Sequence, residues 1–228
     1  MWLAFLAVGW LTDIFSRHNM RNHQKSVKRF SADQFGSFDG VLGKIEQAKR
    51  FEHCRKAAEL GDADAQLQLG WCCARGKGTR QDYTKAVMWF RMAAEQGDAR
   101  AQLKLGICHA RGLGIPLDYE EAAICFFRAA EQGLAEAQNN LGALYMTGQG
   151  VYRDFEKGLN WFYAAAEQGL LRANFNLHLC YTKGIGVEQD GAEASRWMLR
   201  ALEVWKKERP RREALMAHWR AAGIENAV

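Results

Sequence analysis

Proline is nearly absent from this chain, which has two prolines in 228 residues. Proline interrupts helices and sheets and is common in the linkers that join domains. Its scarcity, together with the lack of any stretch rich in proline and serine, argues against two linked domains. With 48% hydrophobic residues, the composition favours a single helical domain.

A long apolar run is also missing. The apolar N-terminal run, Met1–Leu11, has eleven residues, whereas a helix that spans a membrane needs about 17–25. The run lacks the basic start of a signal peptide, and its small-x-small site, Ala7-x-Gly9, would place the cut inside the run. Three interpretations stay open: a helix that touches a membrane through residues 1–15 and precedes a basic patch, a helix docked on the rest of the chain, and a misassigned start codon.

Signatures of catalytic and metal sites are absent as well. The chain contains no Ser-x-x-Lys, Lys-Thr-Gly or Gly-x-Ser-x-Gly sequence, which are the nucleophile motifs of serine hydrolases. It contains no Cys-x-x-Cys and no His-Glu-x-x-His, and its neighbouring Cys and His residues lack the second ligand pair of a zinc site. Residues 76–79, Gly-Lys-Gly-Thr, do not have the order of a phosphate-binding loop. We therefore expect no enzyme, no metal site and no cofactor.

The chain is instead rich in internal repetition. Four copies of one pattern begin at Ala65, Ala101, Ala137 and Ala173, at a spacing of 36 residues. A period of this length is typical of stacked helical repeats, in which each unit buries its apolar face against its neighbours. The predicted fold is therefore all-α, an elongated α/α-solenoid. The residues that recur in register are Leu69/Leu105/Leu141/Leu177, Gly76/Gly112/Gly148/Gly184, Gly78/Gly114/Gly150/Gly186 and Asp82/Asp118/Asp154/Asp190.

The third copy shows the first helix of the repeat, which we call helix A. Ala137, Leu141, Leu144 and Tyr145 lie at positions i, i+4, i+7 and i+8 and therefore share one helical face. The glycines of residues 147–151 then predict a turn, because glycine adopts the positive φ of a helix end without strain.

The second helix of the repeat, helix B, is predicted to begin after Asp154. The Asp154 carboxylate can accept hydrogen bonds from the free N–H groups of the first helical turn. In the second and fourth copies, Glu121 and Glu193 lie three residues after the aspartate and predict a capping box. Helix B of the third copy then ends at Gly169.

The fourth copy departs from the others and is predicted to be an end repeat. His178 and Trp205 occupy positions that are glycine in the first three copies. We expect a separate closing helix after it, with Pro210 near the first turn, where proline is favoured. The predicted segments are residues 1–43 (apolar, then basic), 44–64 (leading half repeat), 65–100, 101–136 and 137–172 (repeats 1–3), 173–208 (repeat 4) and 209–228 (closing helix).

The six cysteines do not form a repeating pair in each unit, so a disulfide framework is not predicted. Cys72, Cys108 and Cys180 share one helix-A position, which Leu144 occupies in the third copy. This position is therefore apolar, and reduced core thiols are the default expectation. A Cys108–Cys125 link between the two helices of repeat 2 stays open as an alternative.

The third copy also carries a family resemblance. The string Leu141-Gly142-x-x-Tyr145-x-x-Gly148-x-Gly150-Val151-x-x-Asp154, followed by Trp161 and by Ala165-Ala166-x-x-Gly169, resembles the Sel1-like repeat family, a relative of the tetratricopeptide repeats. This resemblance implies a solenoid that serves as an adaptor or scaffold for protein complexes, often in bacteria, and it implies no shared enzyme activity. Two alternatives stay open: a secreted or envelope factor that acts on a cell-surface protein, and a β-lactamase-like hydrolase. No motif in the sequence supports the hydrolase.

The resemblance to tetratricopeptide arrays implies that helix A lines the concave face and binds the partner. Aromatic residues beside arginine are typical of interface hot spots, and a basic rim attracts acidic ligands. We therefore expect another protein to bind through an acidic, partly apolar segment, although Trp71, Ile107 and Leu179 could equally belong to the core. The candidate partner-binding residues are Leu67, Leu103, Asn139 and Phe175 in one row, Trp71, Ile107 and Leu179 in the next, Arg75, Arg111 and Lys183 at the rim, and Arg100 and Arg172 beside it.

The distribution of charge argues against a nucleic-acid partner. Residues 1–50 carry 8 basic and 4 acidic residues, residues 51–195 carry 15 and 18, and residues 196–228 carry 8 and 4. The repeats are thus mildly acidic, whereas a nucleic-acid binder usually has a basic face along the array. A cytoplasmic location is favoured, while a membrane-associated or envelope location and the oligomeric state stay open.

Overall fold

The computed structural model of the protein describes Lys49 and residues 51–221. Residues Met1–Glu46 and Gln47–Val228 form two separate units, and all described residues belong to the second. The predictions for residues 1–43, including membrane contact through residues 1–15, therefore lie outside the described residues.

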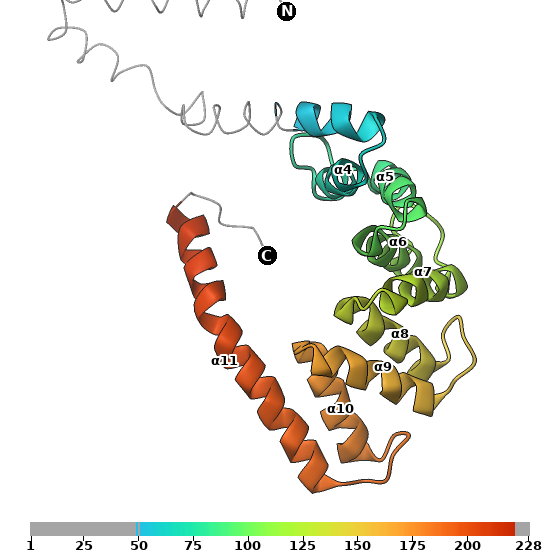
Figure 1. Cartoon of the computed structure of the whole chain (residues 1–228), viewed down its shortest axis with the longest axis vertical. Coiled ribbons are helices and arrows are strands. Elements are labelled where there is room, and N and C mark those ends of the chain that lie inside the picture. The colour runs from blue at the N-terminus through green and yellow to red at the C-terminus, as the bar shows by residue number, and fades with distance from the viewer. Residues whose placement is uncertain (1–48, 50, 222–228) are drawn as a thin grey trace, which may run out of the picture. The chain divides into compact units, whose positions relative to one another are not determined.

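The described residues form helices and no strands, which confirms the all-α solenoid. Each helix packs against the next along the chain (Figure 1). A short helix at residues 51–59 precedes α4 (Ala63–Arg75), α5 (Tyr83–Glu95), α6 (Ala99–Arg111), α7 (Tyr119–Glu131), α8 (Ala135–Thr147), α9 (Phe155–Glu167), α10 (Leu171–Lys183) and α11 (Gly191–Ala221). Of these, α4, α6, α8 and α10 are the helices A of repeats 1–4, and α5, α7, α9 and α11 are the helices B.

The turn between helices A and B needs both of its glycines, for different reasons. Gly148 ends α8 in the left-handed conformation, with φ 73°, and its N–H donates to the carbonyl of Leu144. Gly150 also has a positive φ, and a Cβ at this position would collide with the backbone carbonyl of Tyr119 in the preceding repeat. The first glycine therefore allows the turn, and the second allows neighbouring repeats to pack closely.

Helix B begins at the predicted aspartate in every repeat. Asp154 accepts a hydrogen bond from the N–H of Lys157 at 3.0 Å. The predicted capping boxes at Glu121 and Glu193 are wrong, because the N–H of Asp118 already donates to the carbonyl of His109 at 3.0 Å. The N–H of Asp190 donates in the same way to helix A of its own repeat, and Glu193 instead pairs with Arg196.

A ladder of buried glutamines joins neighbouring helices, and sequence analysis missed it. Gln102 is 6% exposed, donates to the carbonyl of Ala94 in the preceding helix B at 3.4 Å, and accepts from Gln132 at 2.9 Å. One side chain therefore connects three helices. Equivalent amide pairs are Gln96 with Gln66 and Gln168 with Gln138, each at 2.8 Å.

Close packing within each repeat depends on another glycine. A Cβ at Gly106 would lie 2.7 Å from the ring of Phe126, which is buried. The fourth repeat has His178 at the glycine position and Met198 at the phenylalanine position. The imidazole Nδ1 of His178 lies 2.9 Å from the carbonyl oxygen of Ala194, within hydrogen-bonding distance. The larger side chain is therefore accommodated where the ring is absent.

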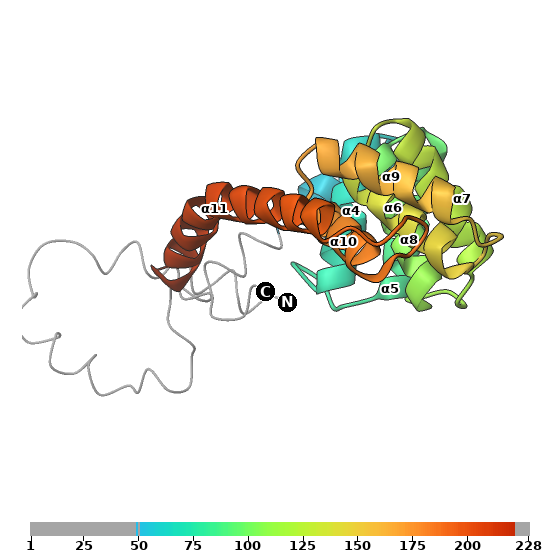
Figure 2. The same ribbon diagram turned by 90° about the horizontal axis from the view of Figure 1, so that it is seen from below.

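The prediction of a separate closing helix differs from the structure. The last helix, α11, continues from Gly191 through Pro210 to Ala221, and Figure 2 shows it running on beyond α10. Trp205 replaces the glycine that follows helix B in the first three repeats, so the usual end signal is missing. Proline has a helical φ, but it removes one backbone donor and its ring crowds the carbonyl four residues earlier, so Pro210 weakens the helix locally without ending it.

Among the described helices, none combines the length and the apolar character that crossing a membrane requires.

Candidate functional site

Five of the predicted partner-binding residues meet in one depression on α4 and α6, which we call the Trp71 pocket. It has a volume of about 630 Å³. The lining residues that sequence analysis did not include are Gln68, Cys72, Lys104, Leu134 and Glu136. Leu134 and Glu136 come from the start of the following repeat, so the pocket spans three helices A. The predicted residues in the pocket are Leu67, Trp71, Arg75, Arg100 and Leu103.

The base of the Trp71 pocket is apolar. Leu67 and Leu103 are 5% and 2% exposed and belong to the core between repeats. Neighbouring repeats cover most of each leucine, so these two candidate residues contribute only a small apolar surface. The remaining surface of both residues faces the pocket, beside the half-buried Trp71 and Leu134.

Two cations lie over the ring of Trp71. The guanidinium carbon of Arg75 is 4.3 Å from the ring centroid, and the ammonium nitrogen of Lys104 is 4.6 Å from it. Burial lowers the pKa of Lys104, and the charge of Arg75 lowers it further, while the carboxylate of Glu136 opposes both. The pocket therefore combines an indole ring with two neighbouring positive charges, a combination suited to an anion next to an apolar group.

Arg100 also lines the pocket, but its charge is engaged by carboxylates of the chain itself. Its guanidinium donates to Asp98 at 2.7 Å and also to Asp64 of the preceding repeat. The hydrogen bonds that Arg100 donates to these two carboxylates raise its pKa. Its charge is therefore already compensated, and the residue links the beginnings of two neighbouring helices A.

Asn139 is buried, at 7% exposure, and is not a free amide on an open face. Its side-chain carbonyl accepts a hydrogen bond from the amide of Asn176 at 2.8 Å. This candidate partner-binding residue therefore has a structural role, a polar contact between repeats 3 and 4.

The other predicted residues do not line the Trp71 pocket. Ile107 is half-buried and packs against the core, whereas Phe175 and Leu179 are 39% and 46% exposed. The remaining predicted cations are exposed and form no ion pair with the described part of the chain: they are Arg111, Arg172 and Lys183.

A sequence profile of the Sel1 repeat matches residues 51–62, 63–98, 99–134, 135–170 and 172–203. The chain belongs to the Sel1 repeat family. These matches cover more than half of the chain and agree with the recurring helix pairs of the structure. Sel1 repeats commonly serve as scaffolds for protein interactions. The family membership predicted from the sequence is thereby confirmed.

Solved structures of bacterial Sel1 repeat proteins resemble this one. The protein c5321, described as a protective antigen of uropathogenic Escherichia coli, is 41% identical with a TM-score of 0.65, over 67% of this chain and 33% of its own. This chain thus spans about a third of that protein. A Sel1 repeat protein from Oxalobacter formigenes is 37% identical with a TM-score of 0.64, over 68% of this chain and 64% of its own. A comparison with curated proteins finds no match.

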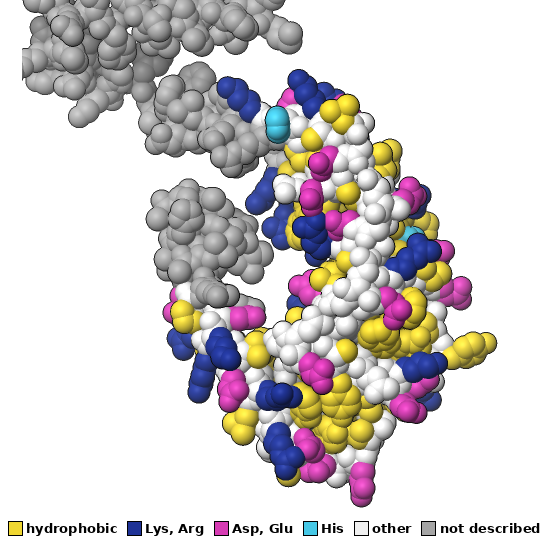
Figure 3. Space-filling view, in the orientation of Figure 1, with side chains coloured by type: hydrophobic (Ala, Val, Ile, Leu, Met, Phe, Trp, Pro, Cys, Tyr) yellow, Lys and Arg dark blue, Asp and Glu magenta, His cyan; other side chains and the backbone are white. Residues whose placement is uncertain are grey.

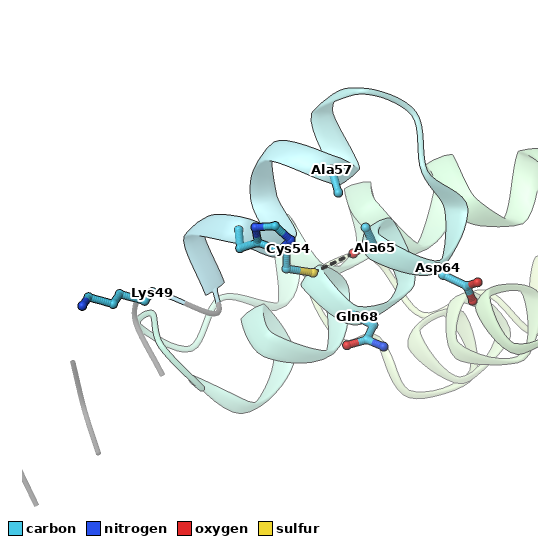
Figure 4. Close-up of a pocket in the computed structure, with 7 residues that line it drawn as sticks. Lys49, Cys54, Ala57, Asp64, Ala65 and Gln68 are labelled. Carbon is cyan, nitrogen blue, oxygen red and sulfur yellow. Dashed lines mark hydrogen bonds between the residues drawn. The ribbon is translucent and has the colours of Figure 1, made fainter. Parts of the chain in front are cut away.

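A second depression of the Sel1 array lies beside the short helix at residues 51–59 and has a volume of about 690 Å³ (Figure 4). The thiol of Cys54 donates to the carbonyl of Ala65 at 3.3 Å, and burial raises its pKa. The thiol is therefore held in its neutral, weakly nucleophilic form. This depression lacks the paired cations and the indole ring of the Trp71 pocket.

The cysteines of the array are all free thiols. The alternative Cys108–Cys125 link is therefore not formed in the structure. Burial raises the pKa of Cys108, Cys125 and Cys180 to about 11 in each case. Within the described part of the chain, no group of three His, Cys, Asp or Glu side chains is arranged to hold a metal ion.

Proposed function

We propose that this Sel1 repeat protein is a non-enzymatic adaptor that binds an acidic, partly apolar segment of another protein on the face formed by helices A. The observation that carries the proposal is the Trp71 pocket, where an indole ring, an apolar base and two cations meet. Tryptophan and arginine are the residues most enriched in interface hot spots.

The charge pattern of the surface supports a local site for the acidic segment. In Figure 3, hydrophobic patches alternate with side chains of both charges on the visible face. Attraction of an acidic partner then depends on particular clusters of cations, of which Arg75 and Lys104 form one. Arg111 is exposed and occupies in repeat 2 the position that Arg75 occupies in repeat 1. It extends the positive charge along helices A.

The test is a quantitative pull-down with the wild-type chain, a Trp71→Ala/Arg111→Glu variant and a Met88→Ala control. Met88 is an exposed apolar residue on α5, a helix B, and is therefore not on the proposed binding face. We expect a partner protein to be enriched by the wild type and by the control but not by the double variant, after equal helicity is verified. Equal enrichment by all three proteins would refute the assignment to the Trp71 pocket.

A second candidate is a secreted or envelope factor that acts on a cell-surface protein. The similarity to an Escherichia coli protein described as a protective antigen favours it. A folded reporter fused to each terminus, assayed in separated cell compartments, tests this candidate: recovery outside the cytoplasm supports it, and recovery only in the cytoplasm refutes it.

A further inference from the structure

We propose that Arg75 and Lys104 hold a side-chain carboxylate of the bound segment, and that Glu136 competes with this carboxylate for the two cations. The inference rests on the proposed adaptor function and assigns the chemistry of its binding site. It makes Glu136 a residue that limits the affinity for the acidic partner.

Neither cation has an ion-pair partner within 4.0 Å in the described part of the chain. Arg100, in the same pocket, is paired with Asp64 and Asp98. Neither Arg75 nor Lys104 forms a hydrogen bond or an ion pair there, although both lie within 4.6 Å of the Trp71 ring centroid. Cation–π attraction to the Trp71 ring brings the two positive charges close together. A carboxylate placed beside them would reduce their mutual repulsion.

The apolar surroundings strengthen such an interaction. Leu67 and Leu103 form the buried base of the pocket, and Lys104 is itself half-buried. Charges attract more strongly where apolar groups replace water. The same base favours an apolar side chain next to the acidic one, so the expected ligand has Asp or Glu adjacent to a hydrophobic residue.

Glu136 resembles a weak internal counter-ion of this site. It is the second residue of α8, it is exposed, and it lines the pocket. Its charge acts on Lys104, yet no ion pair joins the two side chains within 4.0 Å. A ligand carboxylate would therefore meet two attractive charges and one repulsive charge, which Glu136→Gln removes.

The acidic groups beside the pocket favour a peptide over a polyanion. Glu136 lies on one side, and Asp64 is held on the other through Arg100. A nucleic acid carries regularly spaced charges and would place several of them against these carboxylates. A single carboxylate flanked by apolar side chains avoids that repulsion.

The experiment selects random linear peptides displayed on phage, with their C-termini fused to the coat protein, on the full-length chain. We expect the enriched peptides to carry Asp or Glu next to a hydrophobic residue. Synthetic versions with capped termini should bind at least about 10-fold more weakly when the acid is replaced by its amide. Arg75→Gln and Lys104→Gln should each cause a similar loss.

The decisive variant is Glu136→Gln, which should bind the same peptides about 2- to 5-fold more tightly. Glu156→Gln is the matched control, because Glu156 is the exposed second residue of α9 and should not affect binding. Weaker or unchanged binding by Glu136→Gln would overturn the inference.

Enrichment of peptides without acids, or no enrichment, would also overturn it. Loss of partner capture by Trp71→Ala/Arg111→Glu would leave the adaptor function standing in that case. Failure of both experiments would refute both proposals.

Discussion

The first three repeats and the fourth repeat share their turns but differ where a following repeat would pack. Gly184, Gly186 and Asp190 retain the turn chemistry of the earlier copies. By contrast, Leu202 is 41% exposed, at a position where the earlier repeats have alanine that the next helix covers. Trp205 also replaces glycine there. The comparison shows that one set of residues forms the helix pair and another set packs that pair against the next repeat. The two sets can therefore be changed separately.

The largest effect is expected from transferring one residue of repeat 4 into repeat 2. Gly106→His places a side chain against the Phe126 ring, where even a Cβ would lie 2.7 Å away. We expect the free energy of unfolding to fall by about 3 kcal/mol or more, because a well-packed core resists overpacking. Urea denaturation followed by circular dichroism measures this loss.

The compensating change copies the second residue of repeat 4. Phe126→Met in the Gly106→His background recreates the His178/Met198 combination. We expect the double variant to recover about 1 kcal/mol or more relative to the sum of the single variants, which indicates coupling between neighbours. Additive losses would show that the two positions of repeat 4 did not change together for packing reasons.

A smaller difference is expected between the glutamine ladder and its counterpart in repeat 4. Gln102→Ala removes two hydrogen bonds that connect three helices, and we expect a loss of about 2 kcal/mol. Asn174→Ala should cost about 1 kcal/mol or less. The amide of Asn174 donates only to the carbonyl of Leu170, and its side-chain oxygen has no partner in the described structure. An equal loss in both variants, measured by urea denaturation, would contradict the ladder's role.

The helix caps should give a still smaller, pH-dependent difference. Asp98 caps α6, whereas Leu170 occupies the N-cap position of α10 and provides no side-chain cap. Burial alone would raise the pKa of Asp98, but hydrogen bonds from Arg100 and from the N–H of Ala101 lower it overall. Asp98→Ala should therefore cost about 1 kcal/mol at pH 7.

The lowered pKa of Asp98 determines how its contribution to the free energy of unfolding changes with pH. The contribution of the Asp98 charge is complete above the unfolded pKa of about 4, and it is lost as the pH falls through the lower folded value. Denaturation at pH 7 and at pH 3 should show a smaller difference between wild type and Asp98→Ala at pH 3. For Leu170→Ala, the same comparison should show no such change.

The smallest effect is expected at the thiols, where the repeats should behave alike. The pKa of about 11 at Cys108 and at Cys180 leaves little thiolate at pH 8. Iodoacetamide should therefore modify both residues far more slowly in the folded protein than in urea. Mass spectrometry measures the extent of this modification. On the unmodified protein, mass spectrometry with and without reductant tests for the Cys108–Cys125 link, and a mass difference would contradict the free thiols.

Much of the fold could be predicted because the turn residues recur in register. Gly148 ends α8 and Asp154 caps α9, and both roles depend only on neighbouring residues. Such residues recur every 36 residues, so the sequence alone reveals them. The length of α11 was not predicted, because two local signals disagree: Pro210 favours the start of a new helix, whereas Trp205 removes the glycine that would end helix B. The glutamine ladder was also missed, although Gln66, Gln102 and Gln138 recur at the same spacing and gave a usable signal.

The site was predicted only in part, because its residues interact across repeats. Trp71 and Arg75 lie one helical turn apart on helix A, and the resemblance to tetratricopeptide arrays implied that both face the partner. Lys104 and Glu136 come from two later helices, and the compensation of Arg100 by Asp64 is seen only once the helices are packed. Asn139 was a candidate partner-binding residue, and its contact with Asn176 likewise depends on stacking.

The most direct test of the adaptor account is site-specific photocrosslinking in cells. A benzoylphenylalanine at position 68 replaces the exposed Gln68 of the Trp71 pocket, and one at position 152 replaces Tyr152, which is 97% exposed outside the pocket. The account predicts a covalent adduct from position 68 to an acidic, partly apolar segment of another protein, and none to that segment from position 152. An adduct from position 152 alone, or none from position 68, would contradict it.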